Sequence, residues 1–363
     1  MSYPEWEVIR NSTFVRGREF PMISNDMPTF LGIPLARSAA DLKGADAVII
    51  GAPYAAGKGT QYAGVDKVLW LAGPKRVRQQ SVRYRSGYIQ DMDLDVFETL
   101  KVVDYGDAAI PPETNVDPTP ENILRAQAAV EAKVNDALDA GAVPIVIGQN
   151  SPCGSYAIVK PIAERTKGDV GMISLDTHWD AAPLDGLTND PRIAGSGSWK
   201  HKTYEFHKNF REKHLVEIGE RGMLESKDIV RRFLKGGAHF YSSWDVRTRL
   251  GIEGLVKELR HAYAGTKGVY VHFDMDVIGG AGPAPGDILG ELAEPIGLTE
   301  YEVIRIAHEI GKRGLSGFSF ICIPPGSAVI YRTIVYVIMY LLAGMALART
   351  KKPRRARAKA KRR

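Results

Sequence analysis

The sequence has few of the features that mark secreted or membrane proteins. Only two cysteines, Cys153 and Cys322, occur among 363 residues, which is too few for a disulfide framework and fits a reducing compartment. A charged start followed by an apolar core and a small-residue cleavage site is absent, so we expect a cytoplasmic protein. The most apolar run, residues 334–347, is shorter than the roughly 20 residues that cross a bilayer. We therefore predict no transmembrane segment, and a helix buried in the core or against another subunit.

Acidic residues are absent from the C-terminal end, and this segment accounts for the positive net charge. Residues 349–363 contain ten Lys or Arg residues, and without them the net charge of +6 falls to −4. Such a basic block is typically a solvated, disordered tail. It could also contact an acidic partner, an anionic membrane or nucleic acid. We favour the disordered tail and expect neither membrane nor nucleic-acid binding.

Strand-like and helix-like segments alternate along most of the chain. Residues 1–43 lack clear periodicity and are predicted to be an N-terminal extension, followed by one domain over residues 44–348. The predicted strands are residues 47–50, 143–148, 170–176, 215–219, 239–242, 268–274 and 317–323, and the predicted helices are residues 121–140, 152–166, 253–263, 299–312 and 334–347. This alternation favours a three-layer α/β/α domain with a mainly parallel sheet.

Two short motifs place metal-binding side chains at alternate positions after apolar runs. One reads Asp-x-His-x-Asp over residues 176–180, and the other reads Asp-x-Asp over residues 274–276. Alternate residues of a strand share one face, so the five groups could converge if the two strands are neighbours. Clustered carboxylates repel one another unless a cation lies among them. The predicted metal ligands are Asp176, His178, Asp180, Asp274 and Asp276.

Each motif alone could simply end a strand and cap the next element. Both together, at the carboxyl ends of two strands, favour a dinuclear metal site or its remnant, because ligands of α/β sheets gather at those ends. His272 lies two residues before Asp274 on the same predicted strand face. It could reach the metal, but our first interpretation is a packed or hydrogen-bonded histidine.

In order and spacing, these motifs resemble the ureohydrolase superfamily of arginases and agmatinases. The resemblance runs from about Gly51 to about Ala348, and it includes Gly51-Ala52-Pro53-Tyr54 and Ala284-Pro285-Gly286. It implies two divalent metals, manganese or in some members nickel, which lower the pKa of water for attack on a guanidinium carbon.

The resemblance also implies a role for each predicted ligand. Asp176 and Asp274 would bridge the two metals. His178 and Asp276 would complete one metal site, and Asp180 would belong to the other.

Several positions depart from the superfamily pattern. The motif Gly-Gly-Asp/Glu-His-Ser, whose histidine binds the metal beside Asp180, is replaced by residues 148–152, with Ser151 at the histidine position. A later His-Gly, which supplies a catalytic histidine, falls in the stretch around Ser196. The glutamate that holds the guanidinium falls on Cys322, and a thiol cannot form a bidentate, charge-assisted pair. Gly279-Gly280 stands where Asp-Pro is usual.

These departures predict a catalytically weakened or silent chain that binds one metal or none. The chain resembles the partner-type subunits of heteromeric amidinohydrolases such as the nickel-dependent metformin hydrolase. This resemblance implies a hetero-oligomer with a catalytically intact paralogue, which converts a guanidino or biguanide compound to urea and an amine. Two alternatives stay open: an active ureohydrolase of the agmatinase or guanidine hydrolase type with an altered metal site, and hydrolysis of another C–N bond.

Overall fold

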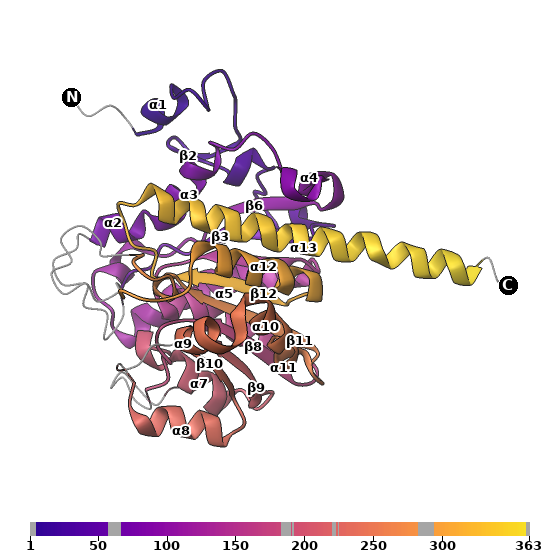
Figure 1. Ribbon diagram of the computed structural model, residues 1–363. Coiled ribbons are helices and arrows are strands. Elements are labelled where there is room, and N and C mark those ends of the chain that lie inside the picture. The colour runs from indigo at the N-terminus through magenta and orange to yellow at the C-terminus, as the bar shows by residue number, and fades with distance from the viewer. Residues whose placement is uncertain are drawn as a thin grey trace.

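The core of the protein is a sheet of eight parallel strands. The computed structural model describes residues 5–56, 67–182, 190, 192–219, 223, 225–281 and 294–360, with side chains described as far as residue 350. The strands lie in the order β10-β9-β8-β11-β12-β7-β3-β6, and every neighbouring pair is parallel (Figure 1). They are β3 (Ala47–Gly51), β6 (Val102–Asp107), β7 (Val143–Ile147), β8 (Val170–Leu175), β9 (Phe210–Ile218), β10 (His239–Tyr241), β11 (Gly268–Asp274) and β12 (Gly317–Ile321).

Helices cover both faces of this sheet. Successive residues of a strand face opposite sides, and in β11 the side chain of Val271 joins one apolar core whereas that of Tyr270 joins the other. The first core is covered by α3 (Gly73–Ser81), α10 (Gly251–Glu258), α11 (Arg260–Tyr263), α12 (Glu300–Arg313) and α13 (Ala328–Ala360). The second is covered by α5 (Pro120–Asp139), α6 (Ala157–Arg165), α7 (Trp199–Phe206) and α8 (Lys227–Lys235). The predicted three-layer α/β/α fold is confirmed.

Further short α-helices and strands precede or lie between these elements. They are α1 (Glu5–Arg10), α2 (Lys67–Leu71), α4 (Val96–Thr99), α9 (Ser243–Asp245), β1 (Met22–Ser24), β2 (Met27–Pro28), β4 (Tyr88–Ile89) and β5 (Leu94–Asp95). Between them, Phe30 and Ile33 join the first core and Leu42 joins the second. The segment predicted to be an N-terminal extension therefore contributes buried side chains, although the domain boundaries at residues 44 and 348 stay predictions.

Helix α13 crosses the molecule beside α12, and its C-terminal end extends past the body of the protein (Figure 1). Its part Ala328–Thr350 is long and apolar enough to cross a membrane, but 67% of the most apolar window is buried inside the protein. A core helix meets the same criterion. The apolar run at residues 334–347 is therefore buried in the core, as the sequence predicted.

Besides the short elements, α3, β6, α7 and α8 were not predicted, and buried charges explain the first three of these. Strand β6 contains Asp104 and Asp107, which break its apolar pattern; both pair with Arg78 of α3, at 2.8 and 2.6 Å. Helix α7 carries the buried Lys200. Charged residues are rarely buried without a partner, and the sequence alone does not show the partner. The charged residues of α3, β6 and α7 therefore suggested that these segments are exposed to solvent. We have no comparable account of α8.

Candidate metal centre

The two predicted motifs lie side by side at the carboxyl edge of the sheet. Strands β8 and β11 are neighbours, with Ser174 opposite His272 and Leu175 opposite Phe273. Asp176 follows directly after β8, and Asp274 is the last residue of β11. The sequence predicted that the two motifs converge if their strands are neighbours. The two strands are neighbours in the sheet.

Backbone hydrogen bonds fix how the chain turns at these two strand ends. The backbone N–H of His178 donates to Asp176 Oδ1 at 2.8 Å, and that of Asp276 donates to Asp274 Oδ1 at 2.9 Å. The backbone N–H of Thr177 donates across to Asp276 Oδ1 at 3.1 Å, which links the two motifs. In each carboxylate one oxygen is thus held by the backbone while the other is directed elsewhere.

A first group of possible ligands comprises Asp176, His178 and Asp276, whose ligand atoms all lie within 4.8 Å of one another. His178 Nδ1 lies 3.0 Å from Asp276 Oδ2 and 3.8 Å from Asp176 Oδ1. Burial lowers the pKa of His178, but the contact with Asp276 and the other nearby carboxylates outweigh burial and raise it to about 11. Proton and metal compete for this nitrogen, so a bound cation would take the place of the proton.

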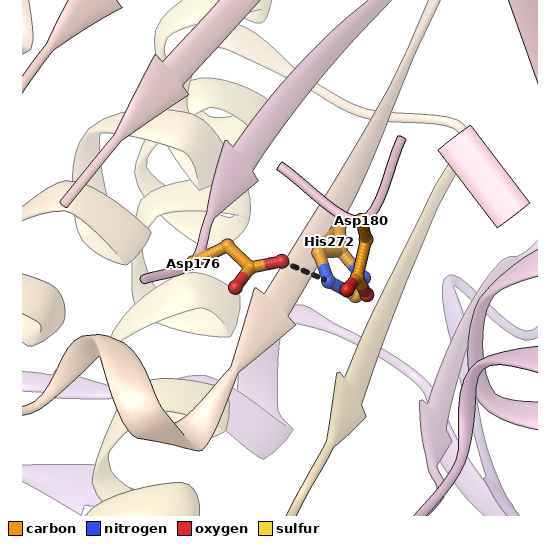
Figure 2. Close-up of side chains that lie close together, drawn as sticks. All are labelled: Asp176, Asp180 and His272. Atoms are coloured by element: carbon orange, nitrogen blue, oxygen red, sulfur yellow. Dashed lines mark ion pairs between the residues drawn. The ribbon is translucent and has the colours of Figure 1, made fainter. Parts of the chain in front are cut away.

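A second group comprises Asp176, Asp180 and His272, again within 4.8 Å of one another. His272 Nε2 lies 3.3 Å from Asp176 Oδ2, and Asp180 lies beside the imidazole (Figure 2). Trp199 Nε1 donates to Asp180 Oδ2 at 2.9 Å. Asp180 has φ of 45°, in the left-handed region that aspartate tolerates better than most residues.

Asp274 belongs to neither group, although it is buried next to both motifs. Burial and the carboxylates of Asp276 and Asp176 raise the pKa of Asp274 well above its usual value. Burial and Asp176 likewise raise the pKa of Asp180 to about 7. Carboxylates this close ionise together only when a cation neutralises them, so the donor set fits a divalent metal.

A row of buried polar residues crosses four strands of the sheet and includes His272. Glu217, Ser174, His272 and Ser319 are paired in register across β9, β8, β11 and β12. Glu217 forms a fully buried ion pair with Lys200 of α7, whose Nζ lies 2.9 and 3.0 Å from the two carboxylate oxygens. The positive charge of Lys200 is therefore paired with a carboxylate of its own.

The sequence profile of the Arginase family matches residues 45–340. The chain belongs to the arginase family. Guanidinobutyrase of Pseudomonas aeruginosa is 26% identical over 344 residues, which cover 90% of this chain and 97% of the relative. The structure of proclavaminate amidinohydrolase from Streptomyces clavuligerus is similar with a TM-score of 0.69 and 23% identity, covering 89% of this chain and 98% of that one. The structure of formiminoglutamase from Trypanosoma cruzi with Mn²⁺ is similar with a TM-score of 0.67 and 24% identity, covering 88% of this chain and 99% of that one.

Three positions where this arginase-family chain departs from the expected pattern lie around the same site. Ser151 Oγ donates to Asp180 Oδ2 at 3.5 Å, and Ser196 Oγ donates to Asn150 Oδ1 at 2.6 Å. Cys322 lies against Asp274 and has φ of 53°. Burial, Asp274 and nearby acids raise the pKa of the Cys322 thiol well above its usual value, so the thiol is neutral. Ser151 and Ser196 retain hydrogen bonds, but none of the three positions supplies an imidazole or a carboxylate.

Sequence reasoning missed part of the site. His272 is buried, hydrogen-bonded to Ser155 and packed on Trp199, as the first interpretation expected, and it also faces Asp176 and Asp180. Glu217 was overlooked, although an acidic residue inside the apolar stretch Leu215–Ile218 was a usable signal. Lys200 gave no such signal, because it stands in a polar segment. The Ala284-Pro285-Gly286 motif lies outside the described residues.

Proposed function

We propose that this chain is a non-catalytic or catalytically weakened subunit of a metal-dependent amidinohydrolase that converts a guanidino or biguanide compound to urea and an amine. Cys322 carries this proposal. It stands where the family resemblance implies the carboxylate that holds the guanidinium, and its thiol is neutral and lies against Asp274. A neutral thiol provides no charge-assisted, bidentate contact for a guanidinium.

The metal-binding part of the site is better kept than the substrate-binding part. Asp176, His178 and Asp276 offer the oxygen and nitrogen donors that manganese and nickel accept, so we propose one of these metals there. When bound, such a metal would lower the pKa of water. Backbone N–H groups hold the carboxylates of Asp176 and Asp276 in place. These two side chains would therefore hold the metal in a fixed position.

Assembly with a catalytically intact paralogue completes the proposal. The partner would carry the Gly-Gly-Asp-His motif that is missing around Ser151. Retention of the whole fold supports this role, because the arginase-family match extends over residues 45–340 although three positions of the site are replaced.

The test is to inactivate one subunit at a time. The chain is co-expressed with a neighbouring-gene paralogue that carries the intact motif, and urea release is measured on the purified complex. With Asp176→Ala in this chain, we expect at least half of the activity, because chemistry takes place in the partner. The equivalent change in the partner should abolish urea release. Size-exclusion chromatography confirms that each complex stays assembled, and abolition of activity by Asp176→Ala in this chain would refute the silent role.

One observation favours a second candidate, an active ureohydrolase with an altered metal site. His272 brings an imidazole to Asp176 and Asp180, which compensates in part for the histidine replaced by Ser151. This candidate still lacks the carboxylate that would hold the guanidinium.

A further inference from the structure

His272 projects from β11 toward the acidic cluster. Its side chain is fully buried, and its Nε2 lies 3.3 Å from Asp176 Oδ2. Asp180 completes a group whose ligand atoms lie within 4.8 Å of one another (Figure 2). We propose that His272 supplies the imidazole of a second metal site with Asp176 and Asp180, in place of the histidine that the family has at the position of Ser151.

The spacing of the donor atoms fits a shared cation. Nitrogen and oxygen ligands at about 2.0–2.1 Å from a metal stand roughly 2.8–3.4 Å apart when the angle at the metal is between a right angle and a tetrahedral one. The distance between His272 Nε2 and Asp176 Oδ2 is 3.3 Å, and that between His178 Nδ1 and Asp276 Oδ2 is 3.0 Å. Asp176 Oδ1 lies 3.8 Å from His178 Nδ1 and Asp176 Oδ2 lies 3.3 Å from His272 Nε2, so Asp176 lies between the two groups.

The surroundings of His272 leave Nε2 available as a ligand. Ser155 Oγ lies 3.2 Å from Nδ1. In the tautomer with the proton on Nδ1, the hydroxyl accepts from Nδ1–H and the Nε2 lone pair faces the carboxylates. Within the described part of the chain, neither His272 Nε2 nor Asp176 Oδ2 makes a hydrogen bond of acceptable geometry, although both are buried. Buried polar atoms without a partner are rare in native proteins, and a cation between them would satisfy both.

Trp199 contacts both the imidazole of His272 and the carboxylate of Asp180. The Trp199 ring lies 4.6 Å from the His272 ring, and Trp199 Nε1 donates to Asp180 Oδ2 at 2.9 Å. The same tryptophan therefore packs on the imidazole and orients the carboxylate. Lys200 does not oppose a cation strongly, because Glu217 balances its charge at 2.9 Å.

This inference concerns metal binding alone and holds whether or not the chain turns over substrate. It departs from the sequence-based expectation of one metal or none, because that expectation assumed that Ser151 leaves the Asp180 site without an imidazole.

Metal stoichiometry tests the proposal directly. The full chain is stripped with a chelator, titrated with MnCl₂ or NiCl₂ by calorimetry, and analysed for bound metal after equilibrium dialysis. We expect two equivalents for the parent protein. His272→Ser and Asp180→Asn should each retain one equivalent and weaken the second by more than about 100-fold, since each removes a ligand of that site. Because both variants make the same prediction, either one that folds decides the question.

Placing a histidine at position 151 should restore the second metal site in a protein that lacks His272. The double variant Ser151→His/His272→Ser should bind two equivalents again, whereas His214→Ser, which removes another buried histidine, should bind two equivalents like the parent. Unfolding temperatures verify that each variant is folded. Unchanged stoichiometry and affinity in His272→Ser, or a parent protein that binds fewer than two equivalents, would overturn the proposal.

Discussion

Lys200 and Glu217 form an ion pair in which both side chains are fully buried, next to the acidic cluster. Burial raises the pKa of Glu217, and the contact with Lys200 opposes this shift and favours the ionised carboxylate. Taking two charges out of water is costly, and the cost is offset only while each charge has its partner. Replacing one member of the pair should therefore destabilise the protein strongly, whereas replacing both should destabilise it little.

Lys200→Met should destabilise the protein by about 3–5 kcal/mol, because it leaves Glu217 buried without its partner. Chemical denaturation monitored by tryptophan fluorescence measures this change. The double variant Lys200→Met/Glu217→Leu should recover most of the loss. Arg125→Met, which breaks an exposed pair with Glu113, serves as the control and should unfold close to the parent. If Lys200→Met unfolded like the parent, the pair would not have the assigned role.

At the scale of elements, the packing of α12 against α13 depends on two glycines. A Cβ added at Gly311 would lie 2.0 Å from the carbonyl oxygen of Leu341, and one added at Gly344 would lie 2.2 Å from that of His308. Real Cβ atoms do not approach backbone so closely, so the two helices could keep this separation only with glycine at both positions.

Gly344→Ala should lower stability by about 1–3 kcal/mol, because the helices must move apart to admit the methyl group. Differential scanning calorimetry would show this as a lower unfolding temperature. At Gly197 an added Cβ meets no atom within 4 Å, so Gly197→Ala is the matched control and should leave the transition unchanged. Equal unfolding temperatures for Gly344→Ala and the parent would argue against the close crossing.

Among the elements, the sequence predicted the strands that carry the site but not how their residues pair. Strands β8 and β11 were predictable, because strands buried on both faces are continuously apolar, and the motifs that follow them are local patterns. The pairing of Glu217 with Ser174 and of Ser174 with His272 depends on strand register, which no local pattern reveals. The contact of His272 with Asp176 was therefore not predicted. Whether the five predicted ligands bind metal stays a prediction.

At the scale of the whole molecule, the chain combines an arginase-family fold with a site in which Ser151, Ser196 and Cys322 stand at positions where the resemblance implies other side chains. The fold keeps clustered carboxylates and an imidazole at the edge of the sheet. It places a neutral thiol, Cys322, and the hydroxyls of Ser151 and Ser196 where the family resemblance implies charged or imidazole groups. A protein of this kind is expected to bind metal and assemble more readily than it catalyses.

Urea release by the purified chain alone tests this account most directly. The protein is loaded with Mn²⁺ or Ni²⁺, its metal content is verified, and it is assayed with 4-guanidinobutyrate, agmatine and 1,1-dimethylbiguanide. We predict turnover at least about 1,000-fold below the roughly 10 s⁻¹ typical of enzymes, with no further loss on Asp176→Ala. Turnover by the chain alone at an ordinary enzymatic rate, abolished by Asp176→Ala, would contradict the account and establish an active ureohydrolase.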